Sequence, residues 1–137
     1  MMKQTDFEAF VNGLPNVQSE ENFGYSFFFV GSDHRLPFVT TADSDNEYDD
    51  VSNLDREGVY RLNIGVGKET FNDLVSDQLD GDVDYAMLNV FLPHPHYSRQ
   101  HFVCILNPAG DNVEKTKQLI NEAHSIADKR LQRKKGN

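Results

Sequence analysis

The clearest alternation of hydrophobic and polar residues lies in the stretch GVYRLNIGV, residues 58–66. Apolar residues recur there at every second position, which is the pattern of a β-strand with one buried face. The buried face is expected to hold Tyr60, Leu62, Ile64 and Val66. Arg61 and Asn63 then lie on the opposite face, which we expect to be open to solvent or to line a concave surface.

Other parts of the chain predict further strands and helices. Short aromatic and β-branched runs predict strands at residues 24–31, 36–43 and 101–106. Apolar residues at helical spacing predict helices at residues 67–78, 84–92 and 111–135. This mixed order is not a regular alternation of strands and helices, and it favours an antiparallel sheet with helices packed on one face. The sequence therefore predicts a single α+β domain over residues 1–137, built as a two-layer sandwich.

A first helix is also predicted near the N-terminus. It begins at Thr5, and Gly13 and Pro15 end it. Thr5 with Glu8 three residues later has the spacing of a capping box, in which each side chain caps a backbone N–H group of the first turn. Asp84 is expected to cap the predicted 84–92 helix in a similar way.

The charge of the chain is unevenly distributed. The net charge is −9, and residues 1–110 carry 18 acids against 6 bases. A body this acidic repels phosphate groups, so nucleic acid is not an expected partner. The stretch at residues 129–137 is basic, and nucleic-acid binding through this end of the last helix is the alternative that charge leaves open.

The remaining composition points to a cytoplasmic protein. No apolar run approaches the roughly 20 residues that a membrane span needs, and the first ten residues lack the apolar core of a signal peptide. Cys104 is the only cysteine, so a disulfide within the chain is impossible and a reducing compartment is expected. Its place in an apolar strand predicts a buried side chain rather than a nucleophile. The chain is expected to be a monomer or a homodimer.

Histidines are concentrated in the stretch FLPHPHYSRQHFVCIL, residues 91–106. His94 and His96 are two residues apart, so in an extended segment stiffened by prolines they point to the same side. With an aspartate from the acidic loop at 43–57 they could form a metal site or an acid–base pair. No complete metal or cofactor motif accompanies them, so the competing interpretation is a connector whose histidines bond to backbone or carboxylate groups.

Arg61 is the second candidate, because it is one of few bases in an acidic body. It either pairs with Asp45, Asp49 or Asp55 of the loop or binds an anionic ligand. The candidate ligand-binding surface therefore comprises Arg61, Asn63, His94, His96, Asp45 and Asp49. No residue is assigned a catalytic or metal-binding role, and no cofactor is expected.

The second half of the chain resembles the MmcQ/YjbR-like domains over residues 58–133. The matching positions are His96 and Tyr97, His101 and Phe102, and then Leu119, Ile120, Ala123 and His124. The segments DNEYD, LDREGVYRLNIGV and LPHPHY resemble, more closely, an uncharacterised bacterial family of unknown function. The broader resemblance implies a frataxin-type α+β fold and a double-wing arrangement that binds DNA. The predicted wings at 24–43 and 58–66 contain only two arginines, so the fold is carried over and the DNA binding is not.

These observations predict a non-enzymatic module that binds a small molecule or a protein. The first alternative is a metal-dependent or acid–base enzyme that uses His94, His96 and a loop aspartate. The second is a nucleic-acid-binding protein that uses the basic end of the last helix.

Overall fold

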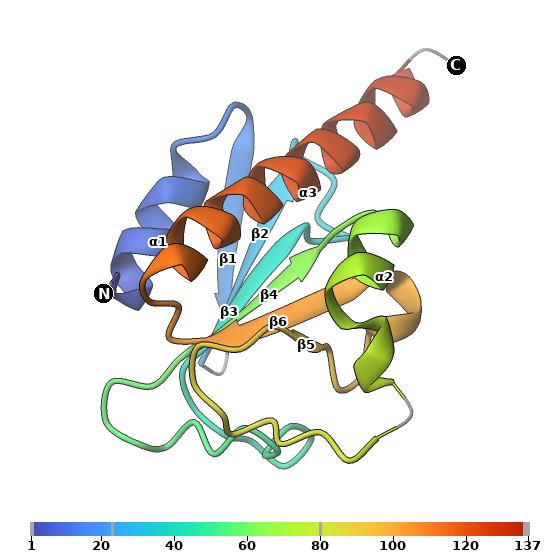
Figure 1. Cartoon of the computed structure of the whole chain (residues 1–137). Coiled ribbons are helices and arrows are strands. Elements are labelled where there is room, and N and C mark those ends of the chain that lie inside the picture. Colours follow the sequence, from blue (N-terminus) through green and yellow to red (C-terminus); the bar gives the residue numbers. More distant parts are fainter. Residues whose placement is uncertain (1, 23, 80, 136–137) are drawn as a thin grey trace.

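The computed structural model describes residues 2–22, 24–79 and 81–135, and Figure 1 shows its ribbon. The elements are α1 (Gln4–Asn12), β1 (Val17–Asn22), β2 (Tyr25–Val30), β3 (Val39–Ala42), β4 (Arg61–Gly65), α2 (Lys68–Val75), β5 (Leu92–Pro93), β6 (Phe102–Leu106) and α3 (Asp111–Lys135). Single 3₁₀ turns lie at Ser76–Gln78 and Ser98–Gln100. None of the described helices is long and apolar enough to cross a membrane.

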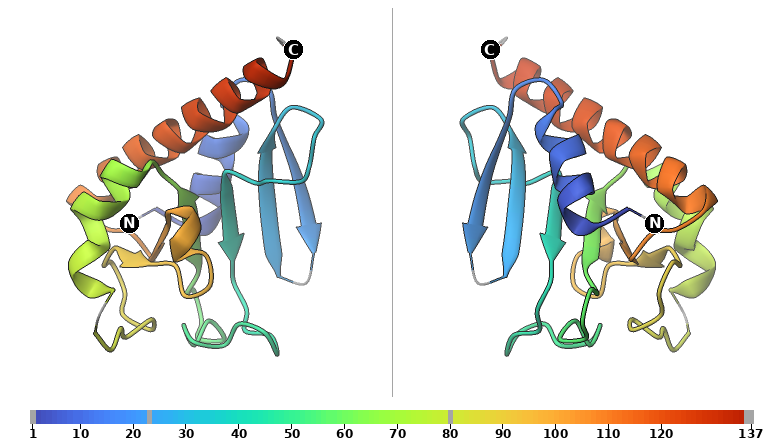
Figure 2. Two further views of the ribbon diagram at one scale, coloured as in Figure 1. Left: turned by 90° about the vertical axis from the view of Figure 1, so that its right-hand side faces the viewer. Right: turned by 90° about the vertical axis from the view of Figure 1, so that its left-hand side faces the viewer.

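The strands form one antiparallel sheet in the order β1-β2-β3-β4-β6-β5. The helices lie on one side of it, as the two views of Figure 2 show. The prediction of an α+β two-layer sandwich is therefore confirmed, and the four predicted strands correspond to β2, β3, β4 and β6.

The main core lies between the sheet and the helices. Leu62 and Ile64 of β4 are fully buried there, as their alternation with polar residues predicts. The three helices contribute Phe7, Val11, Phe71, Val75, Leu119, Ile120, Ala123 and Ala127 to the same cluster. Fully burying each large apolar side chain stabilises the fold by about 1.5–3 kcal/mol, so this layer fixes where the strands lie.

Two local predictions were wrong, and strand β1 was not predicted. The 84–92 helix does not form, because Asp84 caps only one turn by accepting the backbone N–H of Ala86 at 3.0 Å. The cap of α1 is Asp6, which accepts the backbone N–H of Lys3 at 2.9 Å, whereas Glu8 accepts a hydrogen bond from Thr41. Strand β1 was missed because its residues, VQSEEN, are almost all polar and exposed at the sheet edge.

The face of the sheet opposite the helices is also covered, which corrects the expectation of an open surface. Arg61 is fully buried and Asn63 is almost so. Leu54 of the 43–57 loop packs on this face against Ala42 and Leu106 in a second, smaller cluster. Alternation along a strand shows which residues share a face, but it does not show that a loop folds back over that face.

One buried hydroxyl in the helix layer provides a stability test. Thr116 of α3 is fully buried, and its Oγ1 has no hydrogen-bond partner among the described residues. Because an unpaired buried polar group costs roughly 1–3 kcal/mol, Thr116→Val should raise the free energy of unfolding by about 1 kcal/mol in urea denaturation. Thr41 is equally buried but donates to Glu8 at 2.7 Å. The matched variant Thr41→Val should therefore change stability in the opposite direction, and equal losses for both variants would contradict this account.

Candidate functional site

Strand register brings the polar side chains of the covered face together. Tyr25, Ala42 and Arg61 are paired across β2, β3 and β4, so they form one row on the same face. Ala42 is small, and the longer side chains on either side of it both reach Asp49 of the 43–57 loop. The Asp49 carboxylate accepts hydrogen bonds from the Tyr25 hydroxyl and from the Arg61 guanidinium.

Arg61 is the centre of a buried hydrogen-bond network. Both of its terminal nitrogens donate to Asp49, in the fork geometry that makes Arg–carboxylate pairs strong. Its Nη1 also donates to Ser52 Oγ at 2.9 Å, and its Nε donates to Asn63 Oδ1 at 3.0 Å. Asn63 in turn donates to Thr40 Oγ1 at 2.9 Å. The network therefore ties the loop to two adjacent strands.

The positive charge of Arg61 in this network is balanced by the negative charge of Asp49. Burial raises the pKa of Asp49, but hydrogen bonds from Arg61 and Tyr25 and the charge of Arg61 outweigh burial, so the pKa lies below its ordinary value. Burial and the bond to Asp49 raise the pKa of Tyr25 to about 12. At neutral pH Asp49 is thus a carboxylate paired with Arg61. Of the two predicted roles of Arg61, pairing with a loop aspartate is the one observed.

The ring of His94 is held in one orientation by the backbone of the residues that follow it. Its Nδ1 accepts the N–H groups of His96 at 3.0 Å and Tyr97 at 3.1 Å, which closes a turn after β5. Burial, followed by the charge of Arg61, lowers the pKa of His94 to about 3. The neutral ring must therefore carry its proton on Nε2, which forms no hydrogen bond with a described residue.

A small hollow of about 210 Å³ lies beside this ring. It is lined by Gln78, Leu79, Gly81, Asp82, Val83, Tyr85, Pro93, His94, Pro95 and Ser98. Burial raises the pKa of the Tyr85 phenol, which therefore stays protonated at neutral pH. Among the predicted site residues, His94 is the one that lines this hollow.

The six predicted site residues are only partly brought together. Arg61 bonds directly to both Asn63 and Asp49. The charges of Arg61 and Asp49 both act on the pKa of His94. His96 is exposed, and its ring centre lies 6.1 Å from that of His94.

Asp45 has a separate role, because it accepts the backbone N–H of Leu54 at 2.9 Å and stabilises the loop itself. Sequence reasoning missed Tyr25, Ser52 and Tyr85. Only the strand register could have indicated Tyr25, and no sequence signal indicates the other two.

The metal alternative lacks a ligand set. No group of three or more His, Cys, Asp or Glu residues in the described part of the chain is arranged to hold a metal ion. The proline segment turns at residues 95–97 instead of staying extended, so His94 is buried while His96 is exposed. Cys104 is fully buried as expected, and burial raises the pKa of its thiol to about 12.

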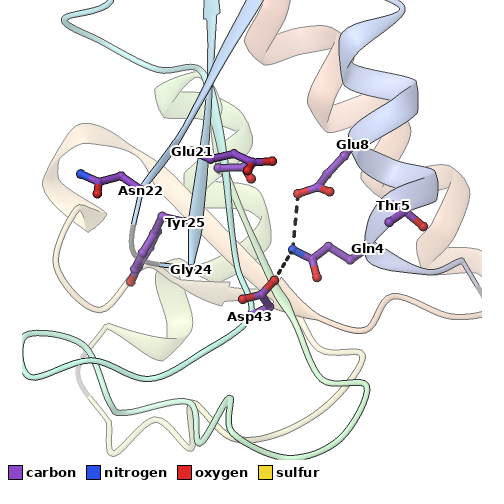
Figure 3. Close-up of a pocket in the computed structure, with 9 residues that line it drawn as sticks. Gln4, Thr5, Glu8, Glu21, Asn22, Gly24, Tyr25 and Asp43 are labelled. Atoms are coloured by element: carbon purple, nitrogen blue, oxygen red, sulfur yellow. Dashed lines mark hydrogen bonds between the residues drawn. The ribbon is translucent and has the colours of Figure 1, made fainter.

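A larger hollow, of about 490 Å³, lies between α1 and the β1–β2 hairpin. Figure 3 shows the Gln4 amide between the carboxylates of Glu8 and Asp43, to which it donates at 3.3 and 3.1 Å. Glu21 also lines the hollow. None of the six predicted site residues lines it.

A comparison with known protein families gives a match over nearly the whole chain. The model of a family of unknown function, DUF6194, matches residues 2–136. The chain belongs to this family. The predicted membership of a family of unknown function is thereby confirmed, and the relation of DUF6194 to the MmcQ/YjbR-like domains stays a prediction. No curated protein and no solved structure matches the chain.

The basic end of the DUF6194 chain is partly described. Residues 136–137 of the predicted basic stretch lie outside the described residues, and Lys134 pairs with Asp33 at 2.9 Å. Nucleic-acid binding through this end stays a prediction. Retention on duplex DNA at moderate salt, lost on deletion of residues 129–137, would be required for it.

The buried ion pair of the DUF6194 protein should dominate the effect of mutations on this face. Asp49→Asn leaves Arg61 as a buried cation without a counter-charge, and it should lower the free energy of unfolding by about 3 kcal/mol. Asp50→Asn, at an exposed neighbour, should change it by less than about 0.5 kcal/mol. Arg61→Met should also destabilise, and the double variant Asp49→Asn with Arg61→Met should lose less than the single losses combined. Additive losses in urea denaturation would contradict direct coupling.

The acid sensitivity of stability should depend on His94. Its folded pKa, about 3, lies below the roughly 6.5 of an unfolded chain, so the unfolded state binds the proton first. The stabilisation is therefore complete above about pH 6.5 and is lost as pH falls toward the folded value. In His94→Asn, a side-chain oxygen can still accept the turn N–H groups but cannot titrate. Between pH 7.5 and 5.5, the native protein should lose about 1 kcal/mol more unfolding free energy than this variant, and parallel losses would refute the assignment.

Proposed function

We propose that this DUF6194 protein is a binding module whose ligand is a small molecule that presents an acceptor oxygen to His94. The observation that carries the proposal is that one ring nitrogen of His94 accepts hydrogen bonds from the backbone, which leaves the other as a donor. Nδ1 is occupied by two backbone N–H groups, so Nε2–H is the ring donor that His94, a residue lining the hollow, has left for a ligand. A donor whose orientation is set before binding loses little entropy when a ligand arrives.

The chemistry of the lining defines the class of ligand. Ser98 and the Tyr85 phenol add hydroxyl donors to the Nε2–H of His94. Pro93 and Pro95 provide rigid apolar walls. A hollow of about 210 Å³ is below the 300–1,000 Å³ of pockets for drug-sized ligands. The proposed ligand is therefore a small carboxylate, amide or amino acid, whose oxygen accepts from these donors.

Asp82 also lines the hollow and is exposed, and its carboxylate suits the ammonium group of an amino acid. An amino acid would thus place its carboxylate at His94 and its ammonium group at Asp82. In this proposal the ligand does not contact Arg61, Asn63 or Asp49. The hydrogen bonds of these residues to one another hold the 43–57 loop against the sheet.

The state of His94 favours binding over acid–base catalysis. A general base works best when its pKa lies near the working pH. The pKa of His94 is about 3, and its basic nitrogen already accepts two hydrogen bonds. The ring is thus a donor that keeps its proton across the physiological range.

The test uses a panel of small carboxylates, amides and amino acids, with binding detected by ligand-observed NMR on the intact protein. At least one member should bind, and His94→Asn should weaken it tenfold or more, because the variant loses the Nε2–H donor. The matched control is His96→Asn, which removes the exposed neighbouring imidazole and should leave affinity unchanged.

Two results would refute the proposal. One is a panel without a binding member, and the other is equal binding by the native protein and His94→Asn. Urea denaturation of His94→Asn at pH 7.5 ensures that lost binding does not reflect lost folding.

A further inference from the structure

We propose that one end of the molecule docks a basic segment of another protein through apolar anchors. This end, which we term the loop platform, consists of residues 43–57 and 81–91. In Figure 1 both segments lie at the end of the molecule opposite the C-terminal end of α3. The 81–91 segment also contributes Gly81, Asp82, Val83 and Tyr85 to the hollow beside His94, but the two anchors tested below, Val51 and Met87, do not line that hollow. The inference therefore does not depend on a ligand bound at His94.

The loop platform is tied together by one arginine. Arg56 donates from Nη2 to the backbone oxygens of Ser52 and Ala86, each at 3.0 Å. Its Nε donates to the backbone oxygen of Asn53 at 2.8 Å. One guanidinium thus joins the two segments of the platform, and the buried Arg61–Asp49 pair anchors the first segment to the sheet. A surface fixed in this way needs little ordering when a partner binds.

Large apolar side chains are exposed on both segments. Val51 precedes Ser52 and Met87 follows Ala86, so they flank the same Arg56 tether, with 44% and 47% of each residue exposed. Leu88 is 46% exposed and Tyr48 is 82% exposed. Single exposed apolar residues are common, but several on two tethered loops at one end of a molecule are typical of an interaction surface.

The charge of the loop platform specifies the partner. Nine acids lie within its two segments, and Arg56 is the sole base. Asp49 is neutralised by Arg61, and Arg56 is engaged with backbone oxygens. Glu47, Asp50, Asp82 and Asp84 are exposed around the apolar residues. This arrangement attracts a segment in which Lys or Arg residues flank apolar ones, and it repels nucleic acid and anionic lipid surfaces.

A second copy of the chain is a poorer occupant. The densest group of basic residues, five of the 13, lies at the end of α3, where Lys134 is already paired with Asp33 at 2.9 Å. Leu131, the apolar residue within that stretch, packs against Gly31 of its own chain. The charge complementarity is therefore better met by a different protein.

The experiment measures binding of a short labelled Leu/Lys peptide to the full chain by fluorescence anisotropy. The Leu/Lys peptide should bind, a Leu/Glu peptide should not, and a Ser/Lys peptide should bind at least tenfold more weakly because it lacks the anchors. The double variant Val51→Ser with Met87→Ser should weaken the Leu/Lys peptide about tenfold. Leu36→Ser is the matched control, since Leu36 is 62% exposed outside the platform, and it should have no effect.

Four results would overturn the proposal. They are no binding of the Leu/Lys peptide, equal binding of the Ser/Lys peptide, no effect of the double variant, and an equal loss in Leu36→Ser. Sedimentation adds a fifth, because a dimer that the double variant abolishes would make a second copy the occupant. His94→Asn should bind the peptide normally, so failure of the small-molecule proposal and failure of this one are distinguishable.

Discussion

The pairing of Arg61 with Asp49 is the interaction on which the non-helical side of the molecule depends. A guanidinium in the central strand β4 is fully buried, and a buried charge without a partner would cost several kcal/mol. The 43–57 loop meets this requirement with Asp49 and Ser52, which bond to the same side chain. An acidic loop that would otherwise be repelled by its own charges is thereby held against the sheet. The sandwich consequently has a helix layer on one side and a loop layer on the other.

Two other features depend on this anchored loop. Burial is the main cause of the low pKa of His94, and the charge of Arg61 lowers it further while the charge of Asp49 opposes this effect, so both members of the ion pair act on that imidazole. Five of the other carboxylates of the loop stay exposed, which makes one end of the molecule both acidic and apolar; they are Asp43, Glu47, Asp50, Asp55 and Glu57. One buried ion pair thus relates the small hollow to the loop platform.

The sequence carried enough information for the sheet and the main helices. The alternation around Leu62 placed the core face of β4 correctly, because one side of that strand faces only helices. It could not show that Arg61 is covered, since burial of the second face depends on a loop distant in sequence. The polar strand β1 left no hydrophobic signal. At the candidate site, the pairing of Arg61 with a loop aspartate was among the predicted alternatives. The Tyr25 contact was not, because it requires the register of three strands.

The chemistry of His94 goes beyond what its turn requires. An asparagine or aspartate oxygen accepts the same two backbone N–H groups in ordinary turns, and neither residue places a second nitrogen at the far edge of the side chain. Burying an imidazole also carries a cost below about pH 6.5, because the unfolded chain binds a proton that the folded protein excludes. The turn alone therefore gives no physical reason for histidine over asparagine. The additional feature that histidine supplies is an Nε2–H donor on a residue that lines the hollow, and this difference is what makes the position a candidate for ligand recognition.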